Sequence, residues 1–343
     1  MRKDFELKVI AKMNESFKQT LDELNADYTQ IKDQPFSHFF CPILFRDEIV
    51  TLCEAHIINQ SFPDAPRTWT IQRKDVDNFY GAYFESEYTA VQHKGHTPGD
   101  ILADKKLSKL FKPQILVDGK PVEYFKADRE VPKEFTRIEF DNNGQIIQLG
   151  LKISPEEFLK KKESNWEMAM SKDIRVSALV SLIKAAHLTL FKILGYRYAL
   201  SSGGYFVGRN ILGEFFLQNK GKTKKEILEN AFSFFKEFAH MVRPLDTSEI
   251  AFQGTITDKQ LLLCQKYGDI AWATIVFART AQTINAVLLP FFDQPEAVVR
   301  FFDFLKNDNE TIDVALLQFE HEQFKLLRTT KIIWPKSGTL YPD

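Results

Sequence analysis

Cysteine is scarce in this chain, with 3 residues in 343. So small and odd a number in a long chain does not build a disulfide framework, and it favours a reducing compartment. An excess of charge of one sign is also lacking, because 45 Lys and Arg residues face 46 Asp and Glu residues and the formal net charge is −1. This balance excludes a protein that binds nucleic acid or an anionic membrane through its overall charge, although it does not exclude local basic patches.

A long apolar run is missing from the beginning of the chain, MRKDFELKVIAKMNESF, where charges are dispersed throughout. A signal peptide or a membrane anchor needs a continuous apolar stretch. We therefore expect no membrane span and a cytoplasmic protein. The P-loop, G-x-S-x-G and H-E-x-x-H motifs are absent as well, so the sequence does not point to the enzyme classes that carry them.

Aromatic residues are abundant instead: 31 Phe, 10 Tyr and 4 Trp make 13% of the chain, and 44% of all residues are hydrophobic. That composition is typical of a folded globular protein and excludes disorder as a description of the whole chain. At roughly 100 to 200 residues per domain, the length predicts two or three domains with substantial cores.

The first section, residues 1–153, has the pattern of a mixed α+β domain. Apolar residues recur at helical spacing among charges over residues 4–25 and predict an amphipathic helix. Short apolar runs broken by loops follow to about residue 92 and indicate short strands. Next come a helix that begins at Asp100 and two hairpin turns, at Asp118-Gly119 and at Asn143-Gly144.

The second section, residues 154–245, is predicted to be mainly helical. It begins at Ser154, which precedes a proline and two acidic residues, a typical helix start. The clearest helix covers residues 174–194, with Gly195 as its C-cap. A glycine-punctuated stretch that resembles β structure follows, and then a second helix over about 224–241.

The third section, residues 246–343, contains two β-rich runs, IAWATIVFA and INAVLLPFF, and a helix expected over residues 295–305. These features predict a C-terminal α+β lobe. The whole chain is therefore expected to be α+β, with an N-terminal mixed domain, a helical segment and the C-terminal lobe.

Two features of the helical section are assigned to structure rather than to chemistry. His187 lies beside the apolar stripe of the 174–194 helix and is interpreted as a boundary histidine that bonds to a partner. The run from Gly203 to Gly208 lacks the G-x-G-x-x-G spacing of a dinucleotide site, so we expect a turn or a bulge there.

Most of the soft metal ligands are gathered in one short segment. Cys41 opens the run C-P-I, and Cys53 precedes His56 by three residues in L-C-E-A-H-I-I-N. Thiolates and imidazoles bind metals, and a histidine at the end of an apolar strand is suited to act as a general base.

This segment resembles the opening of the HNH-endonuclease families, in which a cysteine-containing knuckle precedes an A-H-I strand. The resemblance covers residues 41–78 and implies an HNH-like ββα element in the N-terminal domain. His56 would be the general base, and Asn78 would fix the histidine-bearing loop by hydrogen bonding. The implied activity is hydrolysis of DNA or RNA with a divalent ion such as Mg²⁺ or Mn²⁺.

Two other interpretations of the same segment stay open. In one, Cys41, Cys53 and His56 hold a structural Zn²⁺ that His93 or His96 completes. In the other, the two cysteines are simply small buried residues and His56 is a hydrogen-bonded strand residue.

A basic and aromatic run lies beside the proposed site. Arg67, Arg73 and Lys74 surround Trp69, and on a nucleic-acid-binding protein such cations contact phosphates while the indole stacks on a base. The alternative is a solvated edge strand with one buried tryptophan.

The sequence therefore predicts a metal-dependent nucleic-acid endonuclease with His56 as its base. The alternative is a non-catalytic module in which the same degenerate HNH or zinc-knuckle element binds nucleic acid or a protein partner. A third hypothesis, an enzyme that binds a small substrate between the lobes, has no residue pattern in its favour.

Overall fold

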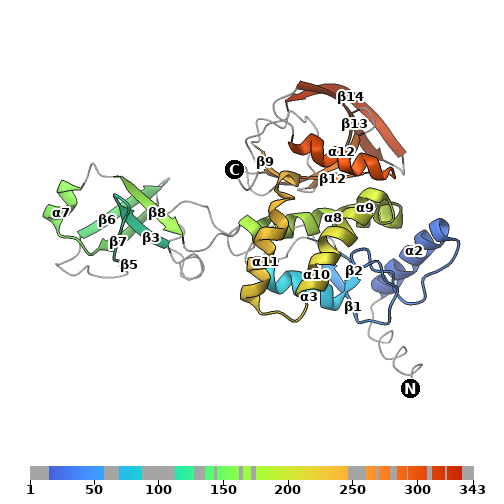
Figure 1. Cartoon of the computed structure of the whole chain (residues 1–343), viewed down its shortest axis with the longest axis horizontal. Coiled ribbons are helices and arrows are strands. Elements are labelled where there is room, and N and C mark those ends of the chain that lie inside the picture. The colour runs from blue at the N-terminus through green and yellow to red at the C-terminus, as the bar shows by residue number, and fades with distance from the viewer. Residues whose placement is uncertain are drawn as a thin grey trace, which may run out of the picture. The chain divides into compact units, whose positions relative to one another are not determined.

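The structure is a computed structural model, and it describes residues 15–57, 69–86, 113–126, 136–142, 145–161, 165–170, 175–245, 260–267, 270–278, 284–291, 293–306, 311–320 and 323–333. Helices and antiparallel strands both contribute to it, so the predicted α+β class is confirmed (Figure 1).

The chain divides into two compact units. The first unit joins residues 1–86 to residues 175–343, and the second unit consists of residues 87–174. These units differ from the expected sections 1–153, 154–245 and 246–343, because the boundary near residue 154 falls inside the second unit. A run of strand and helix signals along the sequence does not reveal that one unit is inserted into another, since that depends on contacts between residues far apart.

The core of the first unit is built around helix α8, Arg175–Ala199. This helix contacts helix α2 (Glu15–Lys32), strand β2 (Trp69–Arg73) and the C-terminal sheet. The helix predicted over 174–194 is confirmed. Gly195 has a φ of 58° and a ψ of −144°, so the regular helix ends at the glycine that was expected to cap it. Leu179, Ile183 and Leu190 are fully buried along the predicted stripe.

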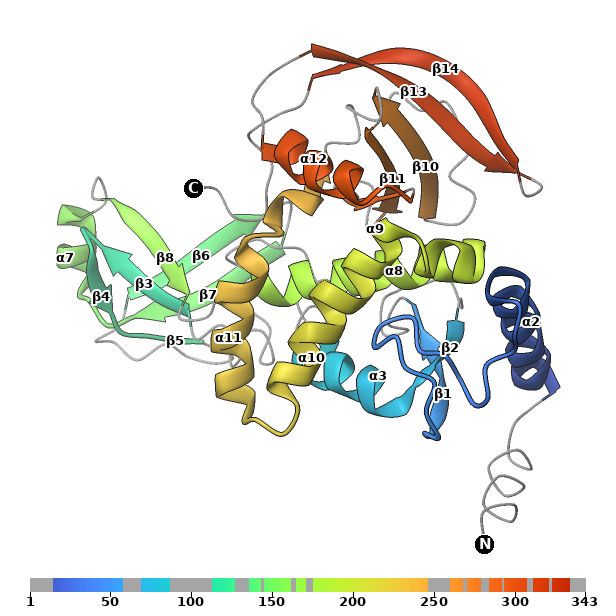
Figure 2. The same ribbon diagram turned by 45° about the vertical axis from the view of Figure 1, so that its right-hand side comes forward.

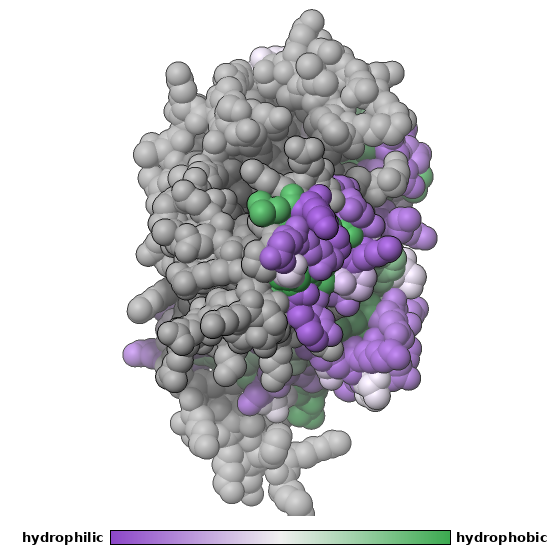
Figure 3. All heavy atoms as spheres, turned by 90° about the vertical axis from the view of Figure 1, so that its left-hand side faces the viewer, coloured by the Kyte–Doolittle hydropathy of each residue, from purple (hydrophilic) through white to green (hydrophobic). Residues whose placement is uncertain are grey.

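Helix α8 is also long and apolar enough to cross a bilayer by length and composition alone. Within this structure, however, 89% of that apolar window is buried by the rest of the protein. The central helix of a folded domain has the same properties, so they do not distinguish a membrane span from a core helix. On the face drawn in Figure 3, the visible described residues are mostly hydrophilic, with small apolar areas between them.

The stretch after α8 was predicted to resemble β structure, and that prediction is wrong. Its residues form helix α9, Ser202–Tyr205, the π-helix η2, Phe206–Gly213, and helix α10, Glu214–Asn219. The glycines serve close packing: a Cβ on Gly203 would lie 2.2 Å from the Pro290 carbonyl oxygen, and one on Gly208 would lie 2.4 Å from the Pro42 carbonyl oxygen. The helix expected over about 224–241 is present as α11, Lys224–Lys236, followed by the short 3-10 turn η3, Ala239–Met241.

The C-terminal part of the first unit is a six-stranded antiparallel sheet in the order β14-β13-β10-β11-β12-β9. Helix α12, Pro295–Lys306, confirms the helix expected over 295–305 and packs Phe301 and Phe304 against Trp272 of β11. The strands are β9 (Val242–Leu245), β10 (Gln260–Tyr267), β11 (Ile270–Ala278), β12 (Ile284–Pro290), β13 (Thr311–Glu320) and β14 (Gln323–Ile333).

The second unit contains two three-stranded antiparallel sheets, β4-β3-β8 and β5-β7-β6. Both predicted hairpins are present, because β3 pairs with β4 across Asp118-Gly119 and β6 pairs with β7 across residues 143–144. Helix α7 begins as predicted, with the Glu157 amide donating to the Ser154 hydroxyl. The bounds are β3 Pro113–Val117, β4 Lys120–Val122, β5 Tyr124–Lys126, β6 Thr136–Asn142, β7 Gln145–Leu151, α7 Pro155–Lys160 and β8 Trp166–Met170.

At the N-terminal end, helix α2 spans Glu15–Lys32 and buries Phe17, Leu24 and Tyr28. The amphipathic helix predicted over 4–25 is thus present from residue 15 onward and continues beyond its expected end. Its first part lies outside the described residues, as does the helix predicted to begin at Asp100.

Candidate functional site

The segment that resembles an HNH nuclease folds as strand, strand and helix. Strand β1, Leu52–His56, pairs antiparallel with strand β2, Trp69–Arg73, and helix α3, Lys74–Tyr80, begins directly after β2. The three elements lie together on one side of α8 (Figure 2). This is the element order that the resemblance implies.

His56 is the last residue of β1, opposite Trp69 in the register, and its side chain is exposed. The alternation of a strand explains this, because Ala55 is fully buried and its neighbour must point the other way. On α3, Val76 and Phe79 face the core, and Asn78 between them is exposed. Both predicted catalytic side chains are therefore at the surface, and the hydrogen bond expected between Asn78 and the His56 loop stays a prediction.

Cys41 lies in a tight turn before β1 and is completely buried. The Leu44 amide donates to the Cys41 Sγ at 3.4 Å. Burial raises the pKa of the Cys41 thiol to about 11, with the amide hydrogen bonds opposing this only in part. Without a bound metal, Cys41 is therefore a protonated thiol at neutral pH.

Side chains from α8 hold the same turn in place. The Tyr196 hydroxyl donates to the Phe40 carbonyl, and the His187 Nε2 lies 3.1 Å from the Pro42 carbonyl oxygen. Gly208 of η2 packs directly on the Pro42 carbonyl. Hydrogen bonds from α8 and close packing by η2 therefore hold this turn.

Cys53, the second residue of β1, is partly buried and donates through its Sγ to the Gln72 carbonyl at 3.6 Å. Burial and the negative charge of Asp77 raise the pKa of this thiol to about 12. Cys41 and Cys53 are both free cysteines. Within the described part of the chain, no group of three or more His, Cys, Asp or Glu side chains is placed to hold a metal ion. His93, expected to complete a site, lies outside it.

The predicted nucleic-acid contacts have different surroundings. The Trp69 ring is half-buried and stacks on Phe17 with ring centroids 6.3 Å apart, and the Lys192 Nζ lies 5.3 Å from its centroid. Lys74 is exposed at the start of α3, whereas Arg67 lies outside the described residues.

Arg73 is buried, with 6% of its surface exposed. Its guanidinium pairs with Glu48 at 2.5 Å and with Asp75 at 3.0 Å. Burial alone would raise the pKa of Asp75, but the Arg73 guanidinium outweighs it and holds that pKa below its usual value. Two carboxylates of the chain therefore occupy Arg73, and a phosphate contact by this residue stays a prediction.

One cluster near β1 was missed by the sequence interpretation. Lys184, buried on α8, places its Nζ 3.0 Å from Asp77 of α3 and 2.6 Å from Glu85 of the π-helix η1, Gly81–Glu85. The negative charge of Asp77 also acts on Cys53. The available signal was a lysine inside the most apolar helix of the chain, since a lysine is rarely buried without a carboxylate partner.

Comparison of the chain with protein-family models, with curated proteins and with solved structures finds no match. Any functional conclusion therefore rests on the residues themselves.

Proposed function

We propose that the β1–β2–α3 element is the catalytic element of a metal-dependent nucleic-acid endonuclease with His56 as general base. The observation that supports the proposal best is the exposed imidazole at the end of β1, in a hairpin that leads directly into α3. Ala55 anchors the strand end in the core, so the backbone of His56 is fixed while its imidazole faces solvent.

The proposed chemistry is hydrolysis of a phosphodiester. A ring nitrogen of His56 removes a proton from water, the water oxygen attacks phosphorus, and the bond from phosphorus to the leaving oxygen breaks, after which that oxygen takes a proton from solvent water. A bound divalent ion supplies charge stabilisation for the phosphate in such reactions. The described residues do not contain a complete ligand set for that ion, so the proposal assigns no ligand geometry to it.

The test is nicking of a supercoiled plasmid with Mg²⁺ or Mn²⁺, by wild type and by His56→Ala. A general base contributes typically 10²- to 10⁴-fold, so we expect a loss of that size in His56→Ala with an unchanged unfolding temperature. His38→Ala is the matched control, because His38 is also exposed but lies in the loop before the knuckle. Absence of nicking by wild type, or an equal loss in His38→Ala, would contradict the proposal.

The second candidate is a non-catalytic binding module built on the same element. The buried thiol of Cys41 favours it, because the knuckle position is filled by packing instead of metal ligands. For this candidate we expect no cleavage but salt-dependent binding of an oligonucleotide. Replacing the exposed Lys74 by Gln should then reduce the salt slope by about one. An unchanged slope would leave a protein partner as the alternative.

A further inference from the structure

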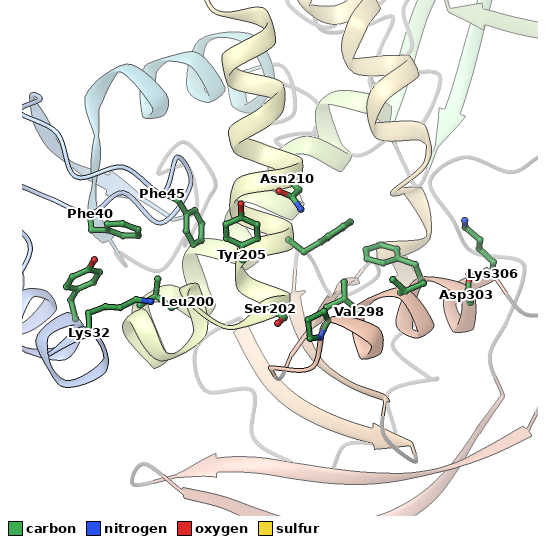
Figure 4. A pocket seen from close by; sticks show the side chains of 15 residues that line it. Lys32, Phe40, Phe45, Leu200, Ser202, Tyr205, Asn210, Val298, Asp303 and Lys306 are labelled. Carbon is green, nitrogen blue, oxygen red and sulfur yellow. The ribbon is translucent and has the colours of Figure 1, made fainter. Parts of the chain in front are cut away.

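An open groove of about 1010 Å³ lies in the first unit, with Phe40 and Phe45 of the 40–45 turn on one side of it (Figure 4). Its walls come from the C-terminal end of α2, the 40–45 turn, α9 with η2, and α12. This volume is at the upper end of the range for small-molecule sites. None of the residues predicted from the sequence to carry chemistry lines it.

The lining of the groove is mainly aromatic and aliphatic. Phe45 and Tyr205 meet edge to face with ring centroids 4.8 Å apart, and Phe206 and Phe302 lie 5.1 Å apart. Tyr205 keeps 44% of its surface exposed and Val299 of α12 keeps 63%. The rings thus hold one another in place, while apolar surface is left in contact with water. Covering that surface with a ligand is favourable, because it removes apolar area from water.

The charged side chains that line the groove are Lys32, Asp303 and Lys306. Asp303 and Lys306 are one turn apart on α12 and lie together at one end, so their charges offset each other (Figure 4). Lys32 lies at the other end, beside Phe40. Asp33 follows Lys32 in the chain but does not line the groove. Lys32 is therefore the charged side chain that lines this end of the groove, next to aromatic rings.

We propose that this groove binds an elongated amphiphilic anion, a long-chain or aryl carboxylate whose apolar body covers Tyr205 and Val299 and whose carboxylate pairs with Lys32. The inference is independent of the proposed nuclease function. A strand of nucleic acid fits less well, because it needs a cation for each of several phosphates and this lining has two lysines and one acid.

The probe is 11-(dansylamino)undecanoate, titrated into the full-length protein and followed by dansyl fluorescence. We expect saturable binding that Lys32→Gln weakens about two- to fivefold, because it removes the charge that faces the carboxylate. Val299→Asp should weaken binding at least tenfold, since it places a carboxylate against the alkyl chain. Lys225→Gln, at an exposed lysine of α11, should leave binding unchanged.

The uncharged methyl ester of the probe distinguishes a site that binds the carboxylate from a surface that binds only the apolar chain. It should bind wild type about as weakly as the acid binds Lys32→Gln, and Lys32→Gln should not weaken it further. Because all three substitutions are at exposed positions, unchanged unfolding temperatures verify the fold of the variants. The proposal is overturned if binding is not saturable, if acid and ester bind equally, or if a single-stranded oligonucleotide displaces the probe.

Discussion

His187 is neutral in the folded protein because its ring is completely buried between two partners. Its Nε2–H donates to the Pro42 carbonyl, so its Nδ1 accepts from the Tyr198 hydroxyl at 3.0 Å. Burial lowers the pKa of His187 to about 4, from an ordinary value near 6.5. The interpretation of this residue as a partner-bonded histidine is confirmed, although it lies in the core and not at a boundary.

A pH dependence of stability follows from that lowered pKa. Above about pH 6.5 the imidazole is neutral in both the folded and the unfolded state, so it adds no pH dependence. Between about pH 6.5 and pH 4 only the unfolded state takes up the proton, and stability should fall by up to about 1.4 kcal/mol per pH unit. The measurement is the free energy of unfolding in urea against pH. His187→Gln should have a shallower acid slope, whereas His38→Gln, at an exposed position, should keep the slope of wild type.

The close approach of neighbouring atoms to position 208 requires a glycine there. A methyl group there would lie 2.4 Å from the Pro42 carbonyl oxygen and 2.9 Å from the His187 ring, so Gly208→Ala should destabilise the protein by about 1 to 3 kcal/mol. Gly81→Ala is the matched control, because Gly81 has helical angles and nothing lies within 4 Å of its Cβ position. The control should be neutral or stabilising by up to about 1 kcal/mol. Equal urea midpoints for the two variants would show that the atoms around position 208 shift to make room for the methyl group.

At the scale of elements, one buried ion cluster joins α3 and η1 to the core helix. Lys184→Met should cost about 3 to 5 kcal/mol, because it leaves Asp77 and Glu85 without their cation in a largely buried place. Adding Asp77→Asn and Glu85→Gln should recover much of that loss. Lys225→Met, at a lysine whose side chain is 86% exposed, should change stability by less than about 0.5 kcal/mol. Chemical denaturation of the three variants gives these values, and a loss in Lys184→Met no larger than in the control would disprove the coupling.

The 40–45 turn should keep its conformation without a metal. We expect excess EDTA to leave the unfolding temperature unchanged, since Tyr196 and His187 already satisfy the turn's carbonyls. Tyr196→Phe should cost about 1 to 3 kcal/mol, because the Phe40 carbonyl loses its donor. Tyr205→Phe, at an exposed tyrosine, is the control. A large drop in unfolding temperature with EDTA would support the zinc interpretation of Cys41 and Cys53.

At the scale of the whole molecule, the second unit interrupts the first. We expect a variant in which a Gly/Ser linker of about 15 residues replaces residues 87–174 to fold, because the first unit has its own core around α8. Calorimetry should show a single transition within a few degrees of the corresponding transition in the full chain. An insoluble or unfolded variant would mean that the first unit depends on the inserted segment.

Local chemistry in the sequence was enough to predict the α+β class, the 174–194 helix with its terminal glycine, both hairpins and the α12 helix. These elements are specified by periodicity, caps and turn residues that lie within a few positions of one another. The strand that exposes His56 belongs to the same group, because alternation along β1 needs only its own residues.

Only the tertiary structure decided which residues meet across the chain. His187 and Pro42 are 145 positions apart, and Lys184 meets Asp77 across 107. The glycine-punctuated segment that contains η2 was predicted to be β structure, because nothing within the segment reveals the carbonyls against which its glycines pack. Arg73 was likewise interpreted as a free cation, because the sequence alone does not show that Glu48 lies beside it. Burial and partner choice are properties of packing between distant segments, and a single sequence records them only where a charged or small residue interrupts an apolar pattern.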